Sequence, residues 1–314
     1  MIRIGEVMLS SIFVTLAYPG KPLSRTSLLL SSLRKFGGSW GQSPLWVLHP
    51  QSRGSFSEDE LARLEDLGAE TVPFPADEGI LQFPLGTKVQ AAAAAERLAE
   101  GKAEQLIWLD GDTLVLSPLD EFTLLPEKVL GYRPVHHKLL GTAWGEPLDQ
   151  YWELVYRACG ASPESDFPMT THLGEKIRPY FNAGCYAIRP AKGILREWES
   201  VFKSHYREPA FRTYYEKDGL YAVFTHQAIF TGVVLANLTE ADLQALSPAV
   251  NYPLHLHEKI PASLQTDRLD DLVTARYEDL LEKPGWQDDF SLSRELEDWV
   301  EVQRAAYFKP GEGS

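Results

Sequence analysis

Asp110 and Asp112 are the residues with the clearest potential for chemistry. They flank Gly111 directly after the apolar segment QLIWL. Two neighbouring carboxylates repel each other, so both stay ionised only beside compensating positive charge. A divalent cation with oxygen ligands, Mg²⁺ or Mn²⁺, supplies that charge and would also hold a diphosphate. An ordinary polar turn contains the same residue types, because Asp-Gly is a common turn dipeptide.

The segments before Asp110 alternate between strand and helix patterns. Apolar or β-branched runs predict strands over 11–17, 44–50, 70–75 and 105–110. Helical spacing predicts a helix over 23–36, and a capping box at Ser57 and Glu60 predicts the start of a second helix. A third helix is predicted over 87–100, where the run AAAAA allows close packing on a sheet. This alternation indicates an α/β fold with a parallel sheet, in which ligands bind beyond the carboxyl ends of the strands.

The second half of the chain alternates less regularly. We expect helices over 147–158, 194–202 and 225–235, a loop over 166–178, and strands over 181–188 and 252–257. A last helix around 292–300 carries an apolar face that we expect to pack on the body. Neither a G-x-G-x-x-G nor a G-x-x-x-x-G-K-[ST] loop occurs, which argues against a Rossmann or P-loop nucleotide site.

The composition excludes several classes of function. The 314 residues include 30 Lys and Arg against 44 Asp and Glu, a formal net charge of −14, so the surface repels nucleic acid. No apolar run reaches the length of a transmembrane span, and the first 20 residues resemble a β-strand more than a signal peptide. Cys159 and Cys185 are the only cysteines, and we expect both to be reduced in a cytoplasmic protein.

Four blocks in the chain resemble one enzyme family. WLDGDTLVL with the following Ser-Pro-Leu resembles the DxD segment of the GT-A glycosyltransferases, particularly the glycogenin-like family eight. Phe181-Asn182-Ala183-Gly184 is similar to the family's F-N-[AS]-G segment, although an insertion around 135–175 is implied. Thr225 to Ala228 and His255 to Pro261 fall where the family has a Gln segment and a C-terminal histidine.

The resemblance covers roughly residues 11 to 261. It implies a GT-A domain over 1–262, with a mostly parallel central sheet flanked by helices. It leaves 263–314 as a C-terminal helical extension packed on that domain.

By this resemblance, a Mn²⁺ or Mg²⁺ ion would be bound by Asp110, Asp112 and a late histidine. His255 and His257 lie two apart in the expected strand, which would point both to the same face. Only one of them need bind the metal, and we favour His257. A half-buried histidine without a metal is the alternative for either residue.

The resemblance also assigns the donor and transfer sites. It implies a nucleobase site at Thr15, Ala17 and Tyr18, a basic residue at Lys88, and donor contacts at Gly111, Ala183 and Gly184. Asn182 and Gln227 would act beside the two aspartates in the transfer, holding the sugar. His226 stands where the family often has an acidic residue before that Gln, so the identity of the transferred sugar is not assigned. His136-His137 could reach the cleft, and Trp144 is a candidate for stacking on a sugar acceptor.

The function implied is a metal-dependent glycosyltransferase. It would move a sugar from a nucleoside-diphosphate sugar, with UDP as the expected nucleotide, to an acceptor hydroxyl of unknown identity. The family-eight resemblance favours retention at the anomeric carbon. The oligomeric state is not readable from the sequence.

Three other functions remain open at this stage. A phosphatase of the haloacid dehalogenase type would use Asp110 as its nucleophile, but that motif wants Thr two positions after the second Asp, where Leu114 stands. A nucleotidyltransferase would need a Gly-rich basic loop after the first strand. A catalytically silent sugar-nucleotide-binding protein would keep the same residues without turnover.

Overall fold

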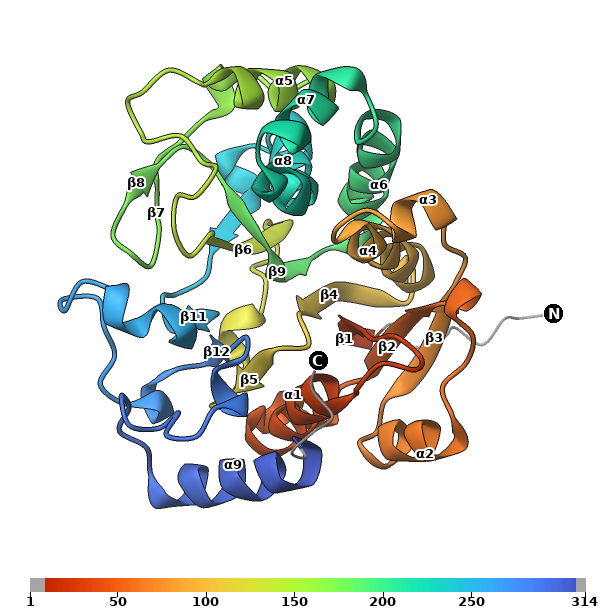
Figure 1. Cartoon of the computed structure of the whole chain (residues 1–314), viewed down its shortest axis with the longest axis vertical. Coiled ribbons are helices and arrows are strands. Elements are labelled where there is room, and N and C mark those ends of the chain that lie inside the picture. The colour runs from red at the N-terminus through yellow and green to blue at the C-terminus, as the bar shows by residue number, and fades with distance from the viewer. Residues whose placement is uncertain (1–8, 309–314) are drawn as a thin grey trace.

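A seven-stranded sheet divides the molecule into two helical layers (Figure 1). The computed structural model describes residues 9–308. Residues 1–8, at the start of the segment that was weighed as a signal peptide, lie outside this range. Across the sheet the order is β10 (Leu243–Ala245), β6 (Leu130–Pro134), β9 (Phe181–Ile188), β4 (Ala103–Leu109), β1 (Leu9–Leu16), β2 (Leu45–Pro50) and β3 (Glu70–Phe74). Only β9 runs antiparallel to its neighbours in the sheet, which confirms the predicted α/β fold with a mostly parallel sheet.

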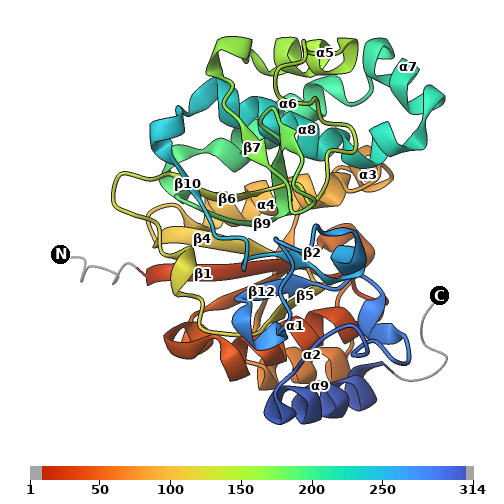
Figure 2. The same ribbon diagram turned by 90° about the vertical axis from the view of Figure 1, so that its left-hand side faces the viewer.

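Helices cover both faces of this sheet (Figure 2). One layer contains α3 (Glu78–Leu81), α4 (Gly86–Ala99), α5 (Gln150–Cys159), α6 (Ile194–His205), α7 (Pro209–Lys217) and α8 (Gly219–Asn237). The opposite layer contains α1 (Ser24–Phe36) and α2 (Glu58–Asp66). The alanine run in α4 is buried, and its small side chains let the helix lie close to β1, β2 and β4.

Local sequence signals account for several element boundaries. Ser57 caps α2 and forms the predicted capping box with Glu60. Asp218 caps α8, which therefore begins six residues before the predicted start at Thr225. The predicted loop over 166–178 contains a short hairpin of β7 (Met169–Thr170) and β8 (Lys176–Ile177).

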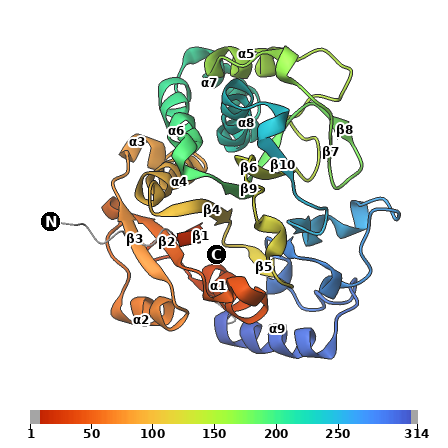
Figure 3. The same ribbon diagram turned by 180° about the vertical axis from the view of Figure 1, so that it is seen from behind.

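A second, smaller sheet joins the C-terminal region to the central domain. Its order is β11 (Tyr252–Pro253), β12 (Thr274–Arg276) and β5 (Thr113–Val115). Since β5 begins immediately after Asp112, residues 263–314 contribute a strand beside the acidic pair as well as a helix. That helix, α9 (Arg294–Tyr307), packs on α1, with the Phe36 and Trp299 rings 4.9 Å apart (Figure 3).

The predicted strand over 252–257 is wrong beyond Pro253. The chain leaves the sheet there and forms a 3₁₀ segment over Leu254–Lys259. With three residues per 3₁₀ turn, side chains two positions apart do not share a face. The expectation that His255 and His257 point the same way is therefore also wrong.

Helix α8 alone among the described residues is long and apolar enough to cross a membrane by length and composition, a feature the sequence analysis did not detect. Most of its apolar window is buried within the protein. Cys159 and Cys185 are both free thiols, as expected.

One buried carboxylate joins α4 to α6. Glu96 on α4 has no solvent exposure and accepts hydrogen bonds from the backbone N–H groups of Leu195 (3.1 Å) and Arg196 (2.8 Å). These first-turn N–H groups of α6 have no partner within their own helix. Burial raises the pKa of Glu96, and the donors from α6 oppose that rise.

We expect Glu96→Ala to lower the free energy of unfolding by on the order of 3 kcal/mol, because two buried N–H donors lose a charged acceptor. Urea denaturation measures the change. Glu100→Ala is the matched control, since Glu100 reaches the same Arg196 from a half-exposed position and should cost about 1 kcal/mol or less. Equal losses in the two variants would contradict the structural role of Glu96.

Candidate functional site

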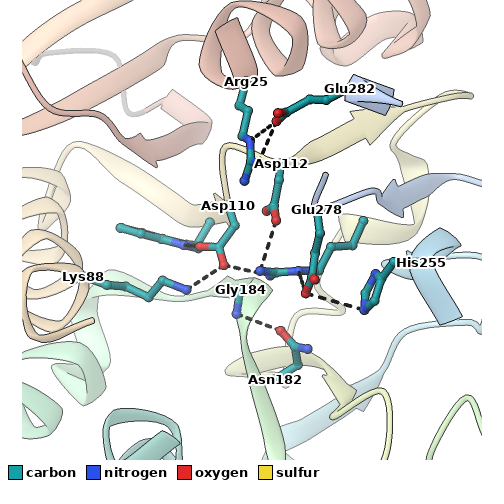
Figure 4. A network of polar contacts seen from close by, with 11 residues as sticks. Arg25, Lys88, Asp110, Asp112, Asn182, Gly184, His255, Glu278 and Glu282 are labelled. Atoms are coloured by element: carbon teal, nitrogen blue, oxygen red, sulfur yellow. Dashed lines mark hydrogen bonds and ion pairs between the residues drawn. The ribbon is translucent and has the colours of Figure 1, made fainter. Parts of the chain in front are cut away.

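Asp110 lies at the carboxyl end of β4, in the middle of the central sheet (Figure 4). One carboxylate oxygen accepts from Lys88 Nζ at 2.6 Å and from Arg276 Nη1 at 3.0 Å, and the other accepts from Trp108 Nε1 at 2.9 Å. Burial alone would raise the pKa of Asp110. The two cations outweigh burial and hold that pKa below its usual value, so this carboxylate is ionised.

Asp112 has a different electrostatic environment although it is only two residues away. Its Oδ2 atom lies 3.1 Å from Arg276 Nη2. Burial raises the pKa of Asp112, Arg276 opposes the rise, and the charge of Asp110 adds to it. The two aspartates therefore shift in opposite directions.

Arg276 is the main site residue that the sequence analysis missed. It ends β12, where it pairs across the strands with Thr113 of β5, and its guanidinium contacts both aspartates. Its Nε also lies 3.6 Å from Glu278, which in turn lies 3.5 Å from His255 Nε2. The available signal was a basic residue within the apolar run LVTAR, because a buried charge needs a partner.

Gly184 on β9 provides the space in which Asp110 and Arg276 meet. The Asp110 N–H donates to the Gly184 carbonyl at 2.9 Å. A Cβ atom at Gly184 would lie 2.5 Å from Asp110 Oδ2 and 2.9 Å from Arg276 Nη1. A side chain at position 184 would therefore require Asp110 or Arg276 to move.

Two cavities meet at the Lys88–Asp110 pair. One of about 410 Å³, here called the β1-loop cavity, is lined by the loop after β1 and by the acidic tripeptide. The other, of about 270 Å³ and here called the histidine cavity, is lined by β9, α8 and four histidines. Lys88 and Asp110 line both cavities, whereas Asp112 lines only the β1-loop cavity.

The predicted donor residues divide between these cavities. Ala17, Tyr18 and Gly111 line the β1-loop cavity, together with the cations Lys21 and Arg25. Thr15 is buried in β1 and lines neither cavity. A Cβ atom at Gly111 would lie in ordinary contact with Thr26, 3.5 Å from its Oγ1.

Two side-chain amides are oriented in the histidine cavity by backbone donors. Asn182 Oδ1 accepts from the Gly184 N–H at 2.8 Å, and Gln227 Oε1 accepts from the Ala183 N–H at 3.0 Å. Because their oxygens are engaged, the groups that these amides can offer to a ligand are the donors of their NH₂ groups. Ala183 is fully buried and contributes only its backbone.

The four histidines of this cavity are His136, His137, His226 and His255. Burial lowers the pKa of each of them, and for His226, which is also near Lys88, the pKa falls to about 3. His226 Nδ1 lies 2.8 Å from the Val223 carbonyl oxygen, to which the neutral ring donates. At neutral pH His226 therefore presents an uncharged ring.

Strained backbone is concentrated at the same cavity. Leu85 (φ 57°), Leu139 (φ 45°) and Glu278 (φ 50°) adopt left-handed conformations and line it. Such conformations cost non-glycine residues on the order of 1–3 kcal/mol and are often found at functional sites. Leu85 directly precedes α4, and its conformation helps to set the position of Lys88 in the first turn.

The predicted metal ligands do not come together. His257 Nδ1 lies 2.8 Å from the Tyr252 hydroxyl, its ring packs 4.7 Å from Phe290, and it lines neither cavity. Arg276 occupies the space between Asp110 and Asp112. Within residues 9–308, no three His, Cys, Asp or Glu side chains are grouped to hold a metal ion. The residues as placed do not fit the predicted ion.

Comparison with known protein families identifies the family of this chain. The model of the Rhodobacterales glycosyltransferase domain matches residues 13–217. This chain belongs to that glycosyltransferase family. The match covers most of the chain and includes Lys88, both aspartates and Asn182. It favours glycosyl transfer over the phosphatase and nucleotidyltransferase alternatives.

Two solved structures of LgtC confirm the predicted GT-A fold of this family member. The galactosyltransferase LgtC, crystallised with donor and acceptor sugar analogues, is 16% identical, with 96% of this chain and 98% of LgtC covered and a TM-score of 0.51. An active-site mutant of LgtC gives 17% identity, the same coverage and a TM-score of 0.52. Mouse xyloside xylosyltransferase 1, without ligands, is 13% identical over 87% of this chain and 98% of its own, with a TM-score of 0.46. None of the curated proteins matches the sequence.

Several site residues of this glycosyltransferase lie beyond the family match. Gln227, His255 and Arg276 all follow residue 217. Trp144, the candidate for acceptor stacking, is 38% exposed, lines neither cavity and packs against the Arg178 guanidinium at 5.9 Å. Its role stays a prediction.

We expect Gly184→Ala to disrupt the ion network, because the added methyl group would displace Asp110 or Arg276. The variant should lose on the order of 1–3 kcal/mol of unfolding free energy, as overpacked cores do. Chemical denaturation measures the loss. Gly54→Ala is no useful control because its φ is +84°, so Gly219→Ala, with no atom within 4 Å of its added Cβ, is used instead. A variant as stable as the wild type would show that the network tolerates a side chain at position 184.

Stability should fall as the pH drops below about 6.5. His226 and His172 have folded-state pKa values of about 3, below the unfolded value near 6.5. Between those values the unfolded state binds more protons, so each histidine removes up to about 1.4 kcal/mol of stability per pH unit. Urea melts of the wild type and His226→Gln between pH 6.5 and 4.5 measure this slope. The variant should show the shallower slope, and identical slopes would contradict the neutral buried state of His226.

Proposed function

We propose that the chain transfers a sugar from a nucleoside-diphosphate sugar, with UDP as the expected nucleotide, to an acceptor hydroxyl. The observation that supports this most directly is the junction of two cavities at Lys88 and Asp110. A donor of this class has two parts of different chemistry, a nucleotide and a sugar, joined by a diphosphate. The proposal places one part in each cavity and the diphosphate at their junction.

In the β1-loop cavity, Tyr18 would stack on the nucleobase and Asp112 would accept from ribose hydroxyls. Lys21, Arg25 and Lys88 line the same space, where Arg25 pairs with Glu282 and Lys88 pairs with Asp110. These cations would contact the anionic donor on a chain whose formal net charge is −14.

In the histidine cavity, the amide NH₂ groups of Asn182 and Gln227 would donate to sugar oxygens. Their orientation is set in advance by the backbone of β9, so little reorganisation is needed when the sugar enters. His226 would contact the sugar as a neutral group in place of the acidic residue found in related enzymes. The identity of the sugar that the site accepts would then depend on its contact with the uncharged His226 side chain.

The transfer itself would break the bond between the anomeric carbon and the departing phosphate oxygen and form a bond between that carbon and the acceptor's hydroxyl oxygen. Lys88 would stabilise the charge that develops on the diphosphate. Asp110 is bound to two cations and to Trp108, so it is occupied as a structural anion and is a poor candidate for the base. We propose that the departing phosphate accepts the acceptor's proton and that the configuration is retained.

The divalent cation predicted from the sequence takes no part in this proposed transfer, because Arg276 lies between the two aspartates expected to bind it. A cytoplasmic location, inferred from the two cysteines, stays a prediction. The acceptor would enter from the side of the histidine cavity, which the loop residues His137 and Leu139 border.

Melting of the purified chain with UDP, GDP, ADP or CDP tests the donor site. A nucleotide at a hundred times its dissociation constant adds about 2.7 kcal/mol to the stability of the native state. We expect one nucleotide, UDP, to raise the melting temperature, and Asp112→Ala to lose the shift. Asp298→Ala, on the exposed face of α9, should keep it.

Turnover distinguishes the enzyme from a silent binding protein. Release of UDP from a panel of UDP-sugars, measured with and without added acceptor sugars, should follow the nucleotide that gives the melting shift. A melting shift without release from any donor sugar would favour the silent sugar-nucleotide-binding alternative. A panel without any shift would overturn the donor site.

A further inference from the structure

The guanidinium of Arg276 fills the gap between the two aspartates. Its Nη1 lies 3.0 Å from Asp110 Oδ2 and its Nη2 lies 3.1 Å from Asp112 Oδ2, one nitrogen on each carboxylate. A Mg²⁺ ion bound to the same two oxygens would lie about 2.0–2.1 Å from each. Arg276 and such an ion therefore compete for one position.

Arg276 is held at that position by the backbone around it. It ends β12, where it pairs with Thr113, and the next N–H, that of Tyr277, donates to the Asp112 carbonyl at 3.1 Å. The register of β12 on β5 thus brings Arg276 beside the acidic pair. Gly184 leaves room for it, since a Cβ there would lie 2.9 Å from Nη1.

Two cations contact the acidic pair without an added ion. Lys88 and Arg276 supply two positive charges against the two aspartates, and Glu278 contacts Arg276 from a half-exposed position. The pKa of Arg276 would be lowered by burial, but Asp112, Asp110 and Glu278 raise it above its usual value, so the guanidinium stays charged. The charge compensation that the sequence analysis assigned to a metal is already present in the chain.

Both cations also keep hydrogen-bond donors for a ligand. Arg276 has five N–H donors, and its contacts with Asp110, Asp112 and Glu278 occupy at most three of them. Lys88 has three and uses one on Asp110. A planar guanidinium is suited to bind phosphate oxygens through such remaining donors.

We propose that Arg276 replaces the divalent cation in this glycosyltransferase and, with Lys88, binds the donor diphosphate without a metal. This inference rests on the proposed function, because it concerns the same donor. It identifies Arg276 as a specificity-determining residue for the diphosphate. Arg276, which lies beyond the residues that the family model matches, would then take the place of the metal ion.

The test compares nucleotide binding in the presence of EDTA and of MnCl₂. The full chain is melted with UDP, GDP, ADP and CDP in each condition, and the dissociation constant of the nucleotide that binds is measured by calorimetry. If Arg276 replaces the metal, the nucleotide should raise the melting temperature equally in EDTA and in MnCl₂. The proposal also expects no Mn²⁺ binding by the nucleotide-free chain, measured from the electron paramagnetic resonance signal of free Mn²⁺.

Arg276→Gln tests the residue itself. Removing one charge from a buried ionic contact should weaken nucleotide binding in EDTA by about 30-fold or more. The variant exposes two carboxylates, so it should gain Mn²⁺ binding that the wild type lacks. Arg268→Gln is the matched control, because Arg268 lies in the same C-terminal region and makes only a half-exposed pair with Asp270.

The outcomes separate this inference from the proposed function. A nucleotide shift that requires Mn²⁺ in the wild type would overturn the role of Arg276 and keep the donor site. A shift in Arg276→Gln that equals the wild type in EDTA would also overturn it. If no nucleotide shifts the melt in either condition, both proposals fail. Should Arg276→Gln not fold, the comparison on the unaltered chain decides alone.

Discussion

The buried carboxylate of Asp110 is the group on which the arrangement of the site depends. Removing a carboxylate from water costs several kcal/mol, so it is stable inside the protein only where its partners are in place. Those partners come from α4, β4 and β12, and β9 accepts the Asp110 N–H. Helix α4 and the small sheet must therefore dock on the central sheet before the site exists. Loss of either cation would leave an uncompensated charge at the end of β4.

Local patterns in the sequence were sufficient to predict the parts of this site that lie on the central sheet. The apolar run QLIWL predicted β4 and the position of Asp110, and FNAGCYAI predicted β9 with the bounds it has. The alanine run predicted α4 and hence the place of Lys88. Each of these signals is contained in one long element whose burial pattern is readable along the chain.

Arg276 was not predictable in this way. It lies 166 residues from Asp110, and their contact depends on the pairing of two three-residue strands. Such short strands carry too few residues to show a period. The strand predicted around His257 was wrong for a related reason: the alternation in YPLHLH is typical of a strand, but only Tyr252 and Pro253 pair with β12 before the chain turns into a 3₁₀ segment. Tertiary pairing, rather than local pattern, decided both residues.

The opposite pKa shifts of the two aspartates indicate a division of roles. Asp110 has two cationic partners and borders both cavities, so its charge is constant and it positions Lys88 and Arg276. Asp112 has a raised pKa, shares one cation and borders only the β1-loop cavity. A ligand in that cavity would meet the carboxylate whose charge is less firmly held. The same two residue types, two positions apart, thus become a structural anion and a ligand-facing group, because Lys88 and Trp108 bind only Asp110 while Asp112 shares Arg276 and lies in the field of the Asp110 charge.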